Sequence, residues 1–309
     1  MKVDSYGHEH DGASRFRIPF YLFLNAASSI GIVFTNKVVF QTYHFRYGTL
    51  LTLIHFVVTF LGLELCRRFG LFERKKDVDL MKVVPLCVSF CGFVVLTNIS
   101  LLYNSVGFYQ LMKVLTTPLI VVIQTLFYAE TFSMKVKLSL ALTCVGVAIA
   151  TVTDTQANTV GTIFALSALV ITSMYQIWVG TKQKELDCSG YQLLYLQAPM
   201  SALLLIPVVP LMDDSLADLI MHPPSQGAII AILMSSVLAF LVNLSIFLVI
   251  GKTSPVTYNV LGHFKLTIIL TLGFVAFDAP IDAKNVSGIL VTLAGVIWYT
   301  HLKQNGSKQ

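Results

Sequence analysis

Two lysines stand in apolar stretches of this chain, where a positive charge is unexpected. Lys113 lies within YQLMKVLTTPLIVVIQTLF and Lys265 within SPVTYNVLGHFKLTIILTLGFVAF. Each stretch is apolar enough, at about 20 residues, to cross a bilayer. A cation in the middle of a membrane costs roughly 2.5–3.5 kcal/mol on insertion scales, so such side chains tend to face a wet cavity and carry function. Neither stretch supplies an acidic residue near its lysine, which predicts that an anionic substrate neutralises the charge.

Both lysines share a helix face with other groups that can contact a substrate, because side chains three, four or seven residues apart project to one side of a helix. These faces carry Tyr109, Lys113 and Thr116 in the first stretch, and Tyr258, Gly262 and Lys265 in the second. A glycine on such a face lets a ligand or a neighbouring helix approach closely.

Further polar side chains in apolar surroundings have two readings each. Asn98 and Asn259 can hydrogen-bond a sugar or a base, or can join two helices. His263 can donate to a phosphate or can simply pack. Lys37 can line the pathway or reach for the membrane interface. Tyr195 and Gln197, which precede Pro199, are also candidates for the cavity wall.

The composition predicts a membrane protein along the whole chain. Of its 309 residues, 55% are hydrophobic and 12% charged, and the mean hydropathy is +0.75. Soluble domains average about 45–50% apolar and about 25% charged residues. Ten apolar segments can be drawn, at 17–41, 47–66, 79–103, 107–128, 136–153, 159–179, 190–212, 225–250, 254–277 and 285–303. The predicted fold class is therefore an all-α polytopic membrane protein with ten transmembrane helices.

The basic residues predict the orientation. With the N-terminus placed in the cytosol, 16 of the 21 Lys and Arg residues fall on the cytosolic side, two on the opposite side and three within segments. This asymmetry follows the positive-inside rule. We therefore expect both termini in the cytosol, with tails at 1–16 and 304–309.

A weak internal repeat divides the transporter domain, 17–303, into two halves. VSFCGFVVLTNISL in the third segment and MSSVLAFLVNLSIF in the eighth both end in Asn-Ile/Leu-Ser, and each is followed by a segment that bears a lysine. An odd number of helices in each half inverts the second half in the membrane. Inverted repeats are typical of secondary transporters, which hold substrate near the bilayer midplane. The predicted repeats are 17–155 and 156–303.

The chain lacks the motifs of an enzyme or a pump. It contains no P-loop, no HExxH zinc motif and no Ser/His nucleophile motif. We expect no enzymatic activity, no cofactor, no metal and no nucleic-acid partner. The expected partners are an anionic small molecule and the lipid bilayer. The small residues Gly146, Gly288 and Gly295 could support helix pairing, including pairing between two copies in a homodimer.

Three stretches resemble a known family. NISLLYNSVGFYQLMKVLTTPLIVVIQTLFY, YLQAPMS and NLSIFLVIGKTSPVTYNVLGHFK are similar to the triose-phosphate/nucleotide-sugar translocators of the drug/metabolite transporter superfamily, and most similar to the E subfamily of solute carrier family 35. The resemblance covers about Phe16 to Lys303. It implies two inverted halves of five helices and an exchange mechanism. Lys113 and Lys265 match two lysines that grip phosphate in triose-phosphate members, whereas Leu266 stands where those members have an arginine.

The residues and the resemblance together predict an antiporter of the Golgi or endoplasmic reticulum membrane. It is expected to exchange a nucleotide-sugar, with UDP-sugars as the leading class, for a nucleoside monophosphate by alternating access. An exchanger of sugar phosphate, phosphoenolpyruvate or inorganic phosphate is the alternative within the class. A scaffold or regulator without transport activity, and a membrane-embedded enzyme acting on phosphates, are alternatives from other classes.

Overall fold

Helices account for all the regular secondary structure that is described. The computed structural model describes residues 11–103, 106–151, 158–213, 216–276 and 283–306. The long helices are α1 (Asp11–Lys37), α2 (Gly48–Arg68), α3 (Val84–Tyr103), α4 (Val106–Phe127), α5 (Met134–Thr151), α6 (Thr159–Glu185), α7 (Gly190–Leu205), α10 (Gln226–Lys252), α11 (Pro255–Ala276) and α12 (Ala283–Gly306). Short elements are η1, a π-helix at Val38–Thr42, η2, a 3-10 helix at Leu80–Lys82, α8 (Val209–Met212) and α9 (Leu216–Met221).

The long helices correspond one by one to the predicted segments, but some boundaries differ. The segment predicted at 190–212 is not one helix: α7 ends at Leu205, a turn follows, and α8 begins at Val209. Pro207 explains the break, because it lies in the turn and has no backbone N–H to donate to α7. Pro210 lies in the first turn of α8, where proline is tolerated. Helix α6 runs six residues beyond its predicted end at 179, to Glu185.

Several helices begin where polar side chains cap their free backbone N–H groups. Asn158 accepts hydrogen bonds from Val160 N and Gly161 N at the start of α6, at 2.9 and 3.2 Å. Ser189 and Gln192 form a reciprocal capping box at the start of α7. Such caps are typically worth about 1 kcal/mol each and fix where a helix begins.

Five of the described helical segments are long and apolar enough to cross a membrane by length and composition. They are Phe16–Thr42, Gly48–Arg68, Leu80–Thr97, Thr159–Glu185 and Gln226–Lys252. Large apolar side chains are exposed on the outside of the bundle, for example Phe23, which is 71% exposed. An apolar outer surface of this kind is what contact with lipid requires. The all-helical, multi-pass character is thereby confirmed, whereas the number of crossings, the repeats and the side of the termini stay predictions.

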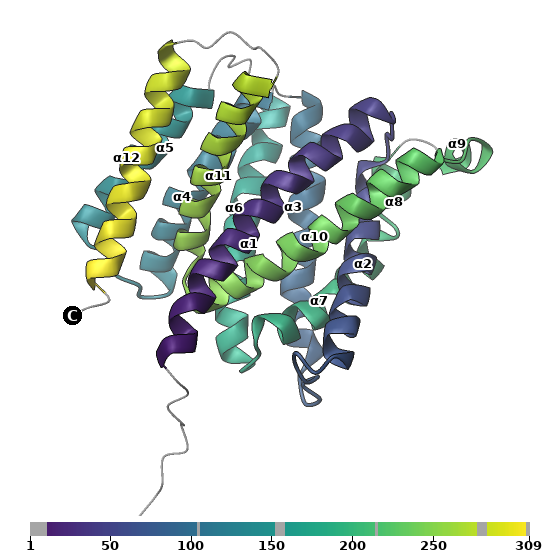
Figure 1. The fold of residues 1–309 in the computed structure, drawn as a ribbon, viewed down its shortest axis with the longest axis horizontal. Helices are drawn as coiled ribbons and strands as arrows, with labels where there is room; N and C mark the ends of the chain where they lie inside the picture. Colours follow the sequence, from purple (N-terminus) through teal and green to yellow (C-terminus); the bar gives the residue numbers. More distant parts are fainter. Residues whose placement is uncertain (1–10, 104–105, 152–157, 214–215, 277–282, 307–309) are drawn as a thin grey trace, which may run out of the picture.

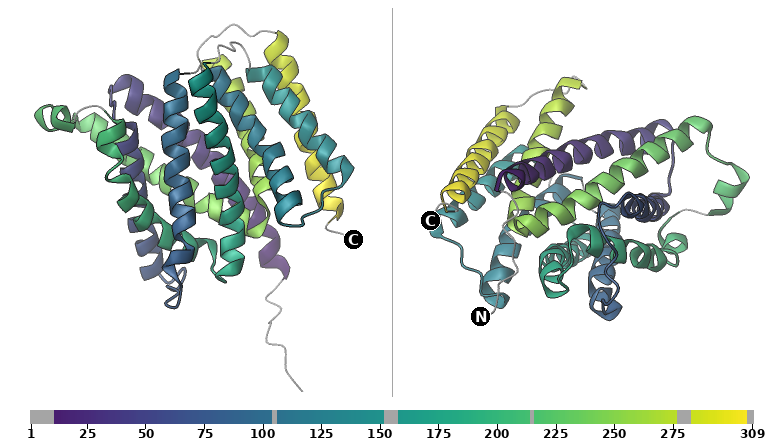
Figure 2. Two further views of the ribbon diagram at one scale, coloured as in Figure 1. Left: turned by 180° about the vertical axis from the view of Figure 1, so that it is seen from behind. Right: turned by 60° about the horizontal axis from the view of Figure 1, so that its bottom comes forward.

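The two ends of the helical bundle lie on one side of the molecule. Helix α1 begins, and helix α12 ends, at the lower side of the view in Figure 1. We call this side the termini face. Helices α1 and α10 run side by side across the bundle, and α5 packs along α12 at one edge (Figures 1 and 2).

The packing partners follow the same pattern in both parts of the chain. Helix α3 packs against α6 as α10 packs against α1, and α2 packs against α10 as α7 packs against α3. Likewise α4 contacts α5 and α6, whereas α11 contacts α12 and α1. Three further pairs, α2 with α7, α4 with α11 and α5 with α12, join helices five positions apart in the series of long helices.

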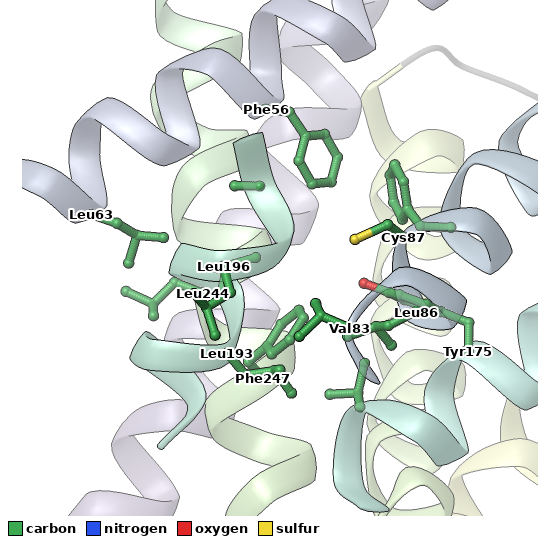
Figure 3. Packing of buried hydrophobic residues seen from close by; sticks show 14 of the residues in the cluster. Phe56, Leu63, Val83, Leu86, Cys87, Tyr175, Leu193, Leu196, Leu244 and Phe247 are labelled. Carbon is green, nitrogen blue, oxygen red and sulfur yellow. The ribbon is translucent and has the colours of Figure 1, made fainter. Parts of the chain in front are cut away.

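The largest apolar cluster fills the space between α2, α3, α6, α7 and α10. We call it the packed cluster; among its members are Phe56, Phe90, Tyr175, Leu193 and Phe247. Figure 3 shows side chains of these helices directed toward one another. The rings of Phe56 and Phe90 lie 4.4 Å apart, centroid to centroid. Tightly interdigitated side chains give such helices their stability through dispersion contacts.

Glycines let α5 and α12 approach closely. A Cβ atom at Gly146 would lie 2.4 Å from the backbone N of Thr292, and one at Gly295 would lie 2.4 Å from Thr143 Oγ1. The carbonyl O of Gly288 would lie 2.9 Å from the same added atom at Gly146. The small residues that suggested a homodimer therefore serve a helix pair within one chain, and they no longer support dimerisation.

Candidate functional site

A cavity of about 430 Å³, with apolar walls and several polar and charged side chains, lies between six helices. Three of these helices, α1, α3 and α4, belong to the first half of the sequence. The other three, α6, α10 and α11, belong to the second half. Its volume falls in the range of ligand sites, which is about 300–1,000 Å³. Its polar, charged and aromatic lining residues are Ser29, Phe93, Thr97, Ser100, Lys113, Thr116, Thr172, Gln176, Tyr258, Asn259, His263 and Lys265.

Both predicted lysines contribute to this cavity. Lys113 reaches it from α4, with an exposed side chain, and Lys265 reaches it from α11, with a side chain that is only 7% exposed. None of the described residues that line the cavity is an aspartate or a glutamate. Two like charges at one low-dielectric site repel each other, and an anion that binds between them removes that repulsion.

Neutral oxygen atoms hold the ammonium group of Lys265. Its Nζ donates to Asn25 Oδ1 at 2.6 Å and to Ser29 Oγ at 3.2 Å, both on α1. The same atom lies 5.2 Å from the ring centroid of Tyr258, which is within the range of a cation–π contact. The ion pairs among the described residues do not include Lys265. The charge is therefore solvated by dipoles and a ring face.

The face of α11 that was expected to contact substrate lines the cavity. Tyr258, Gly262 and Lys265 all belong to its wall. A Cβ atom at Gly262 would meet no atom within 4 Å, so the glycine leaves open space beside the lysine. Thr116 of α4 also lines the cavity, as its spacing from Lys113 predicted.

Two polar residues of α11 line the cavity and also join helices. Asn259 Nδ2 donates to Gln176 Oε1 on α6 and to Pro255 O, the latter at 2.9 Å. His263 Nε2 lies 2.7 Å from Thr117 Oγ1 on α4. Asn259 and His263 were each expected either to contact substrate or to join and pack helices. The two roles are compatible, because each side chain makes an interhelical hydrogen bond and also lines the cavity.

Three predicted site residues lie outside the set that lines the cavity. Lys37 lies at the last residue of α1, half-buried. Tyr195 Oη donates to Glu64 Oε2 at 3.0 Å, close to the end of α2. Gln197 is fully buried on α7, where its Nε2 donates to Tyr175 Oη at 3.2 Å within the packed cluster. The structure does not bring these three together with the lysines.

Two predicted site residues have side chains outside the described part of the structure. Asn98 falls within the backbone range of α3, and Tyr109 falls within that of α4. Asn243, which marks the repeat in the second half, donates to Thr59 Oγ1 at 3.1 Å and joins α10 to α2.

The contribution of α1 was missed at the sequence level. Asn25 and Ser29 contact Lys265 directly. The available signal was an amide in the middle of the apolar run RIPFYLFLNAASSIGIVF, with a serine four residues later on the same helix face. Thr97 and Thr172, which also line the cavity, carry no comparable signal because threonines are common in membrane helices.

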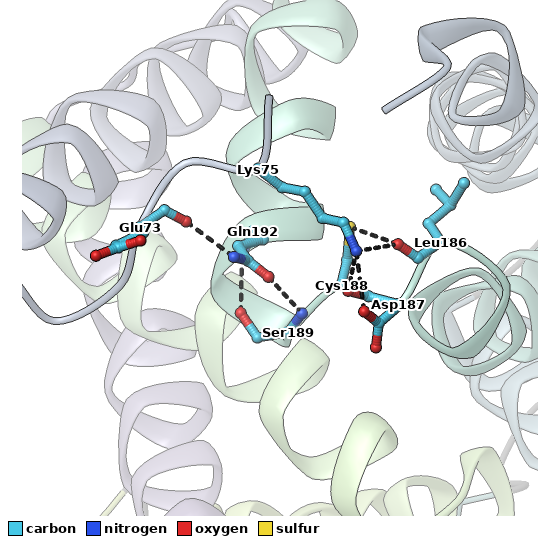
Figure 4. A network of polar contacts seen from close by, with 7 residues as sticks. All are labelled: Glu73, Lys75, Leu186, Asp187, Cys188, Ser189 and Gln192. Atoms are coloured by element: carbon cyan, nitrogen blue, oxygen red, sulfur yellow. Dashed lines mark hydrogen bonds and ion pairs between the residues drawn. The ribbon is translucent and has the colours of Figure 1, made fainter. Parts of the chain in front are cut away.

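A second network of polar contacts lies outside the cavity, in the loops on the termini face. Lys75 Nζ donates to Leu186 O at 2.9 Å and to Asp187 O at 2.6 Å, and it pairs with Asp187 Oδ2 at 3.1 Å. Gln192 Nε2 donates to Glu73 O at 2.8 Å (Figure 4). These contacts join the α2–α3 loop to the α6–α7 loop.

Another cavity, of about 630 Å³, is larger but has less suitable chemistry. It lies between residues 43–47 and 218–228, on the side of the bundle away from the termini face. Its charged residues, Arg46 and Asp218, have opposite signs. Among the described residues, no group of His, Cys, Asp and Glu side chains has the makeup of a metal site. The cationic cavity between the helices is therefore the candidate site.

The fold and this cavity define a class: multi-pass membrane proteins with a cavity between their helices that carries two lysines and no described carboxylate. A sequence profile of the triose-phosphate transporter family matches residues 16–300, and the chain belongs to this family. The resemblance inferred from the sequence is confirmed at this level.

Named relatives from Arabidopsis thaliana align with most of this chain. UDP-xylose transporter 1 is 39% identical over 289 residues, which cover 93% of this chain and 84% of the relative. UDP-rhamnose/UDP-galactose transporter 3 is 35% identical over 281 residues, covering 90% of this chain and 80% of the relative. One solved crystal structure has the same fold, with a TM-score of 0.74 at 13% identity, covering 96% of this chain and 99% of that one.

Proposed function

We propose that this protein carries a nucleotide-sugar across a membrane, with UDP-sugars as the first class to test. One observation carries the proposal: Lys113 and Lys265 line a single cavity between helices from both parts of the chain, and the described lining includes no carboxylate. The diphosphate of a nucleotide-sugar carries two negative charges, which matches two ammonium groups. The UDP-sugar transporters among the relatives direct the choice of cargo.

The lining offers partners for the other parts of such a cargo. Phe93 and Tyr258 supply aromatic faces on which a base can stack, whereas Gln176, Asn259 and Thr172 supply hydrogen-bonding groups for hydroxyls or base edges. Leu266 is apolar and also lines the cavity. A third cation at that position would favour small organophosphates, so its absence supports the larger nucleotide cargo.

The proposed mechanism is antiport by alternating access, with a nucleoside monophosphate as the returning cargo. Bound phosphate cancels the repulsion between the two lysines, so the empty carrier has a higher barrier to closing around its cavity. A ligand can shift a conformational equilibrium only through different affinities for the two states. This charge cancellation supplies such a difference and couples the movement to the cargo.

Two inverted repeats of five helices, 17–155 and 156–303, are part of the proposal. The matching pattern of packing partners supports them, because α3–α6, α2–α10, α4–α5 and α4–α6 each have a counterpart made of the helices five positions away in the series. In this arrangement, α4 and α11 are equivalent helices, and each brings one lysine to the cavity. We also propose that both termini face the cytosol and that the membrane is that of the Golgi or the endoplasmic reticulum.

The test is a ligand screen followed by an exchange assay on the purified, full-length protein. Thermal stabilisation is measured with UMP, UDP-xylose, UDP-galactose, triose phosphate and inorganic phosphate; a ligand at 100 times its Kd stabilises the folded state by about 2.7 kcal/mol. Uptake of labelled UDP-xylose is then measured in liposomes loaded with UMP. The proposal expects stabilisation and uptake with uridine nucleotides.

Each alternative gives its own result in the same assay. Stabilisation by inorganic phosphate and triose phosphate, without an effect of uridine nucleotides, would identify an organophosphate exchanger. Binding of nucleotides without uptake into loaded liposomes would identify a regulator or scaffold. Either result overturns the proposed function.

A further inference from the structure

A chain of hydrogen bonds extends from Lys265 to the backbone of α10 through one buried amide. Lys265 Nζ donates to Asn25 Oδ1 at 2.6 Å, and Asn25 Nδ2 donates to Ser245 Oγ at 2.9 Å. Ser245 Oγ in turn donates to Val242 O at 2.9 Å. The Asn25 side chain is 0% exposed and is not part of the cavity wall. The chain joins α1, α10 and α11.

The direction of this chain is fixed by the ammonium group of Lys265, which can only donate. Asn25 Oδ1 accepts from Lys265 Nζ, which turns Asn25 Nδ2 toward Ser245 Oγ. The Ser245 hydroxyl accepts this bond and donates its single proton to Val242 O. The amide of Asn25 therefore presents its nitrogen to Ser245 and its oxygen to Lys265. A flipped amide would turn its N–H groups toward the Lys265 ammonium group, donor against donor, which a buried site does not tolerate.

The group that accepts from Lys265, the amide oxygen of Asn25, carries no charge, so it leaves the positive charge of the lysine available to an anion. An amide oxygen solvates an ammonium group without cancelling its charge, whereas a carboxylate of nearly the same size would form an ion pair with it. The ammonium group has three N–H donors, of which Asn25 and Ser29 take two. Among the contacts of the described residues, the third N–H is left for a group in the cavity.

We propose that Asn25 is a positioning residue that sets the affinity of the cavity for anions without touching the cargo. Its amide, oriented by Ser245, holds the Lys265 ammonium group at the cavity wall with the positive charge intact. The identity of the anion rests on the proposed function. The role of Asn25 rests on the hydrogen-bond chain alone.

The test compares a neutral and a charged replacement of Asn25 in the purified, full-length protein. Apparent Kd values for UMP and UDP-xylose are measured together with the melting temperature without ligand. Asn25→Asp keeps the shape and supplies a carboxylate that pairs with Lys265, so we expect it to weaken binding at least about 100-fold while the unliganded protein melts at the wild-type temperature or above. Asn25→Ala removes the acceptor, so we expect a loss of about tenfold in affinity and a lower melting temperature.

A neighbouring serine provides the matched control. Ser28 is buried on the same helix, and its hydroxyl donates to Leu24 O, within α1. Ser28→Ala should leave the Kd unchanged. A structural role for Asn25 alone predicts the reverse ranking, with Asn25→Asp less stable than Asn25→Ala and with unchanged Kd values wherever protein folds. Wild-type affinity in folded Asn25→Asp would overturn the proposal.

A second measurement separates this proposal from the proposed function. If the wild-type protein binds none of UMP, UDP-xylose or inorganic phosphate, the proposed function fails. The contact itself is then tested without ligand by the melting temperatures of Asn25→Ala, Lys265→Ala and the double variant. Coupled, non-additive shifts support the positioning role, and additive shifts overturn it.

Discussion

Helices α3, α6 and α10 each contribute to two regions of the molecule that are filled in different ways. On one side they form the packed cluster with α2 and α7, and on the other they line the cavity with α1, α4 and α11. In α6 the change occurs between adjacent residues, because Tyr175 belongs to the cluster and Gln176 to the cavity wall. In α3, Phe90 and Thr97 differ in the same way.

The contrast separates stability from function along the same helices. Apolar side chains in mutual contact hold one face together, whereas the other face keeps open volume and two positive charges that cost stability. A substitution in the packed cluster should therefore change stability more than affinity. A substitution in the cavity should change affinity more than stability.

The largest effect is expected in the packed cluster. Phe247 is 1% exposed on α10, so Phe247→Ala removes a ring that its neighbours cannot replace. We expect a loss of about 3–5 kcal/mol in the free energy of unfolding. Chemical denaturation in detergent measures it, and the same substitution at Phe23, whose side chain is 71% exposed, is the control. Equal losses at both positions would contradict the assignment of the cluster as the stabilising region.

The next largest effect is expected at the two lysines. Lys113→Ala and Lys265→Ala should each remove one of the two proposed charge-assisted contacts with phosphate. Such a contact is worth about 1.5–3 kcal/mol, or roughly 10- to 100-fold in apparent affinity. Exchange of UDP-xylose for UMP in reconstituted vesicles measures the loss, and the melting temperature of each unliganded variant checks the fold. Normal exchange by either folded variant would remove the two-lysine site.

Filling the open space beside Lys265 should lower the affinity for cargo by a smaller amount, which depends on the size of the side chain introduced at Gly262. Gly262→Ala adds a methyl group where no atom lies within 4 Å, so the fold should tolerate it and affinity should fall only a few-fold. Gly262→Leu should lower affinity about tenfold, which corresponds to about 1.4 kcal/mol. The control is Gly92→Ala, where the added atom would lie 3.7 Å from Ile171, in ordinary contact. Unchanged affinity in Gly262→Leu would show that cargo does not use this space.

The smallest effect is expected in the loops on the termini face. Exposed ion pairs contribute about 0–1 kcal/mol, and Asp187 is 99% exposed at its side chain. Because two of the three acceptors of Lys75 are backbone carbonyls, Lys75→Ala should lower the melting temperature more than Asp187→Asn does. The opposite order would mean that the carboxylate provides most of the contact.

Sequence patterns predicted the helices better than the contacts between them. Long apolar runs specify helices almost by themselves, since a membrane-spanning backbone must satisfy its hydrogen bonds internally. The lysines were found because a charge in such a run is rare. The break after Leu205 was missed, although Pro207 was a readable signal for it.

Contacts between distant helices depend on packing that no local pattern records. Gln197 and Tyr195 sit on α7 in sequence surroundings much like those of α11, yet one is buried in the packed cluster and the other contacts Glu64. Asn25 lies 240 residues from Lys265, and only the crossing of α1 with α11 brings them together. Which residue contacts Lys265 from so far away in the sequence can be seen only in the three-dimensional structure.

The most direct test of the central claim is an experimental structure of the protein with a UDP-sugar bound. The account predicts that the diphosphate lies between Lys113 and Lys265, with phosphate oxygens within about 4 Å of both ammonium groups. Nucleotide bound outside this cavity, for example between residues 43–47 and 218–228, or a protein carboxylate paired with either lysine, would contradict it.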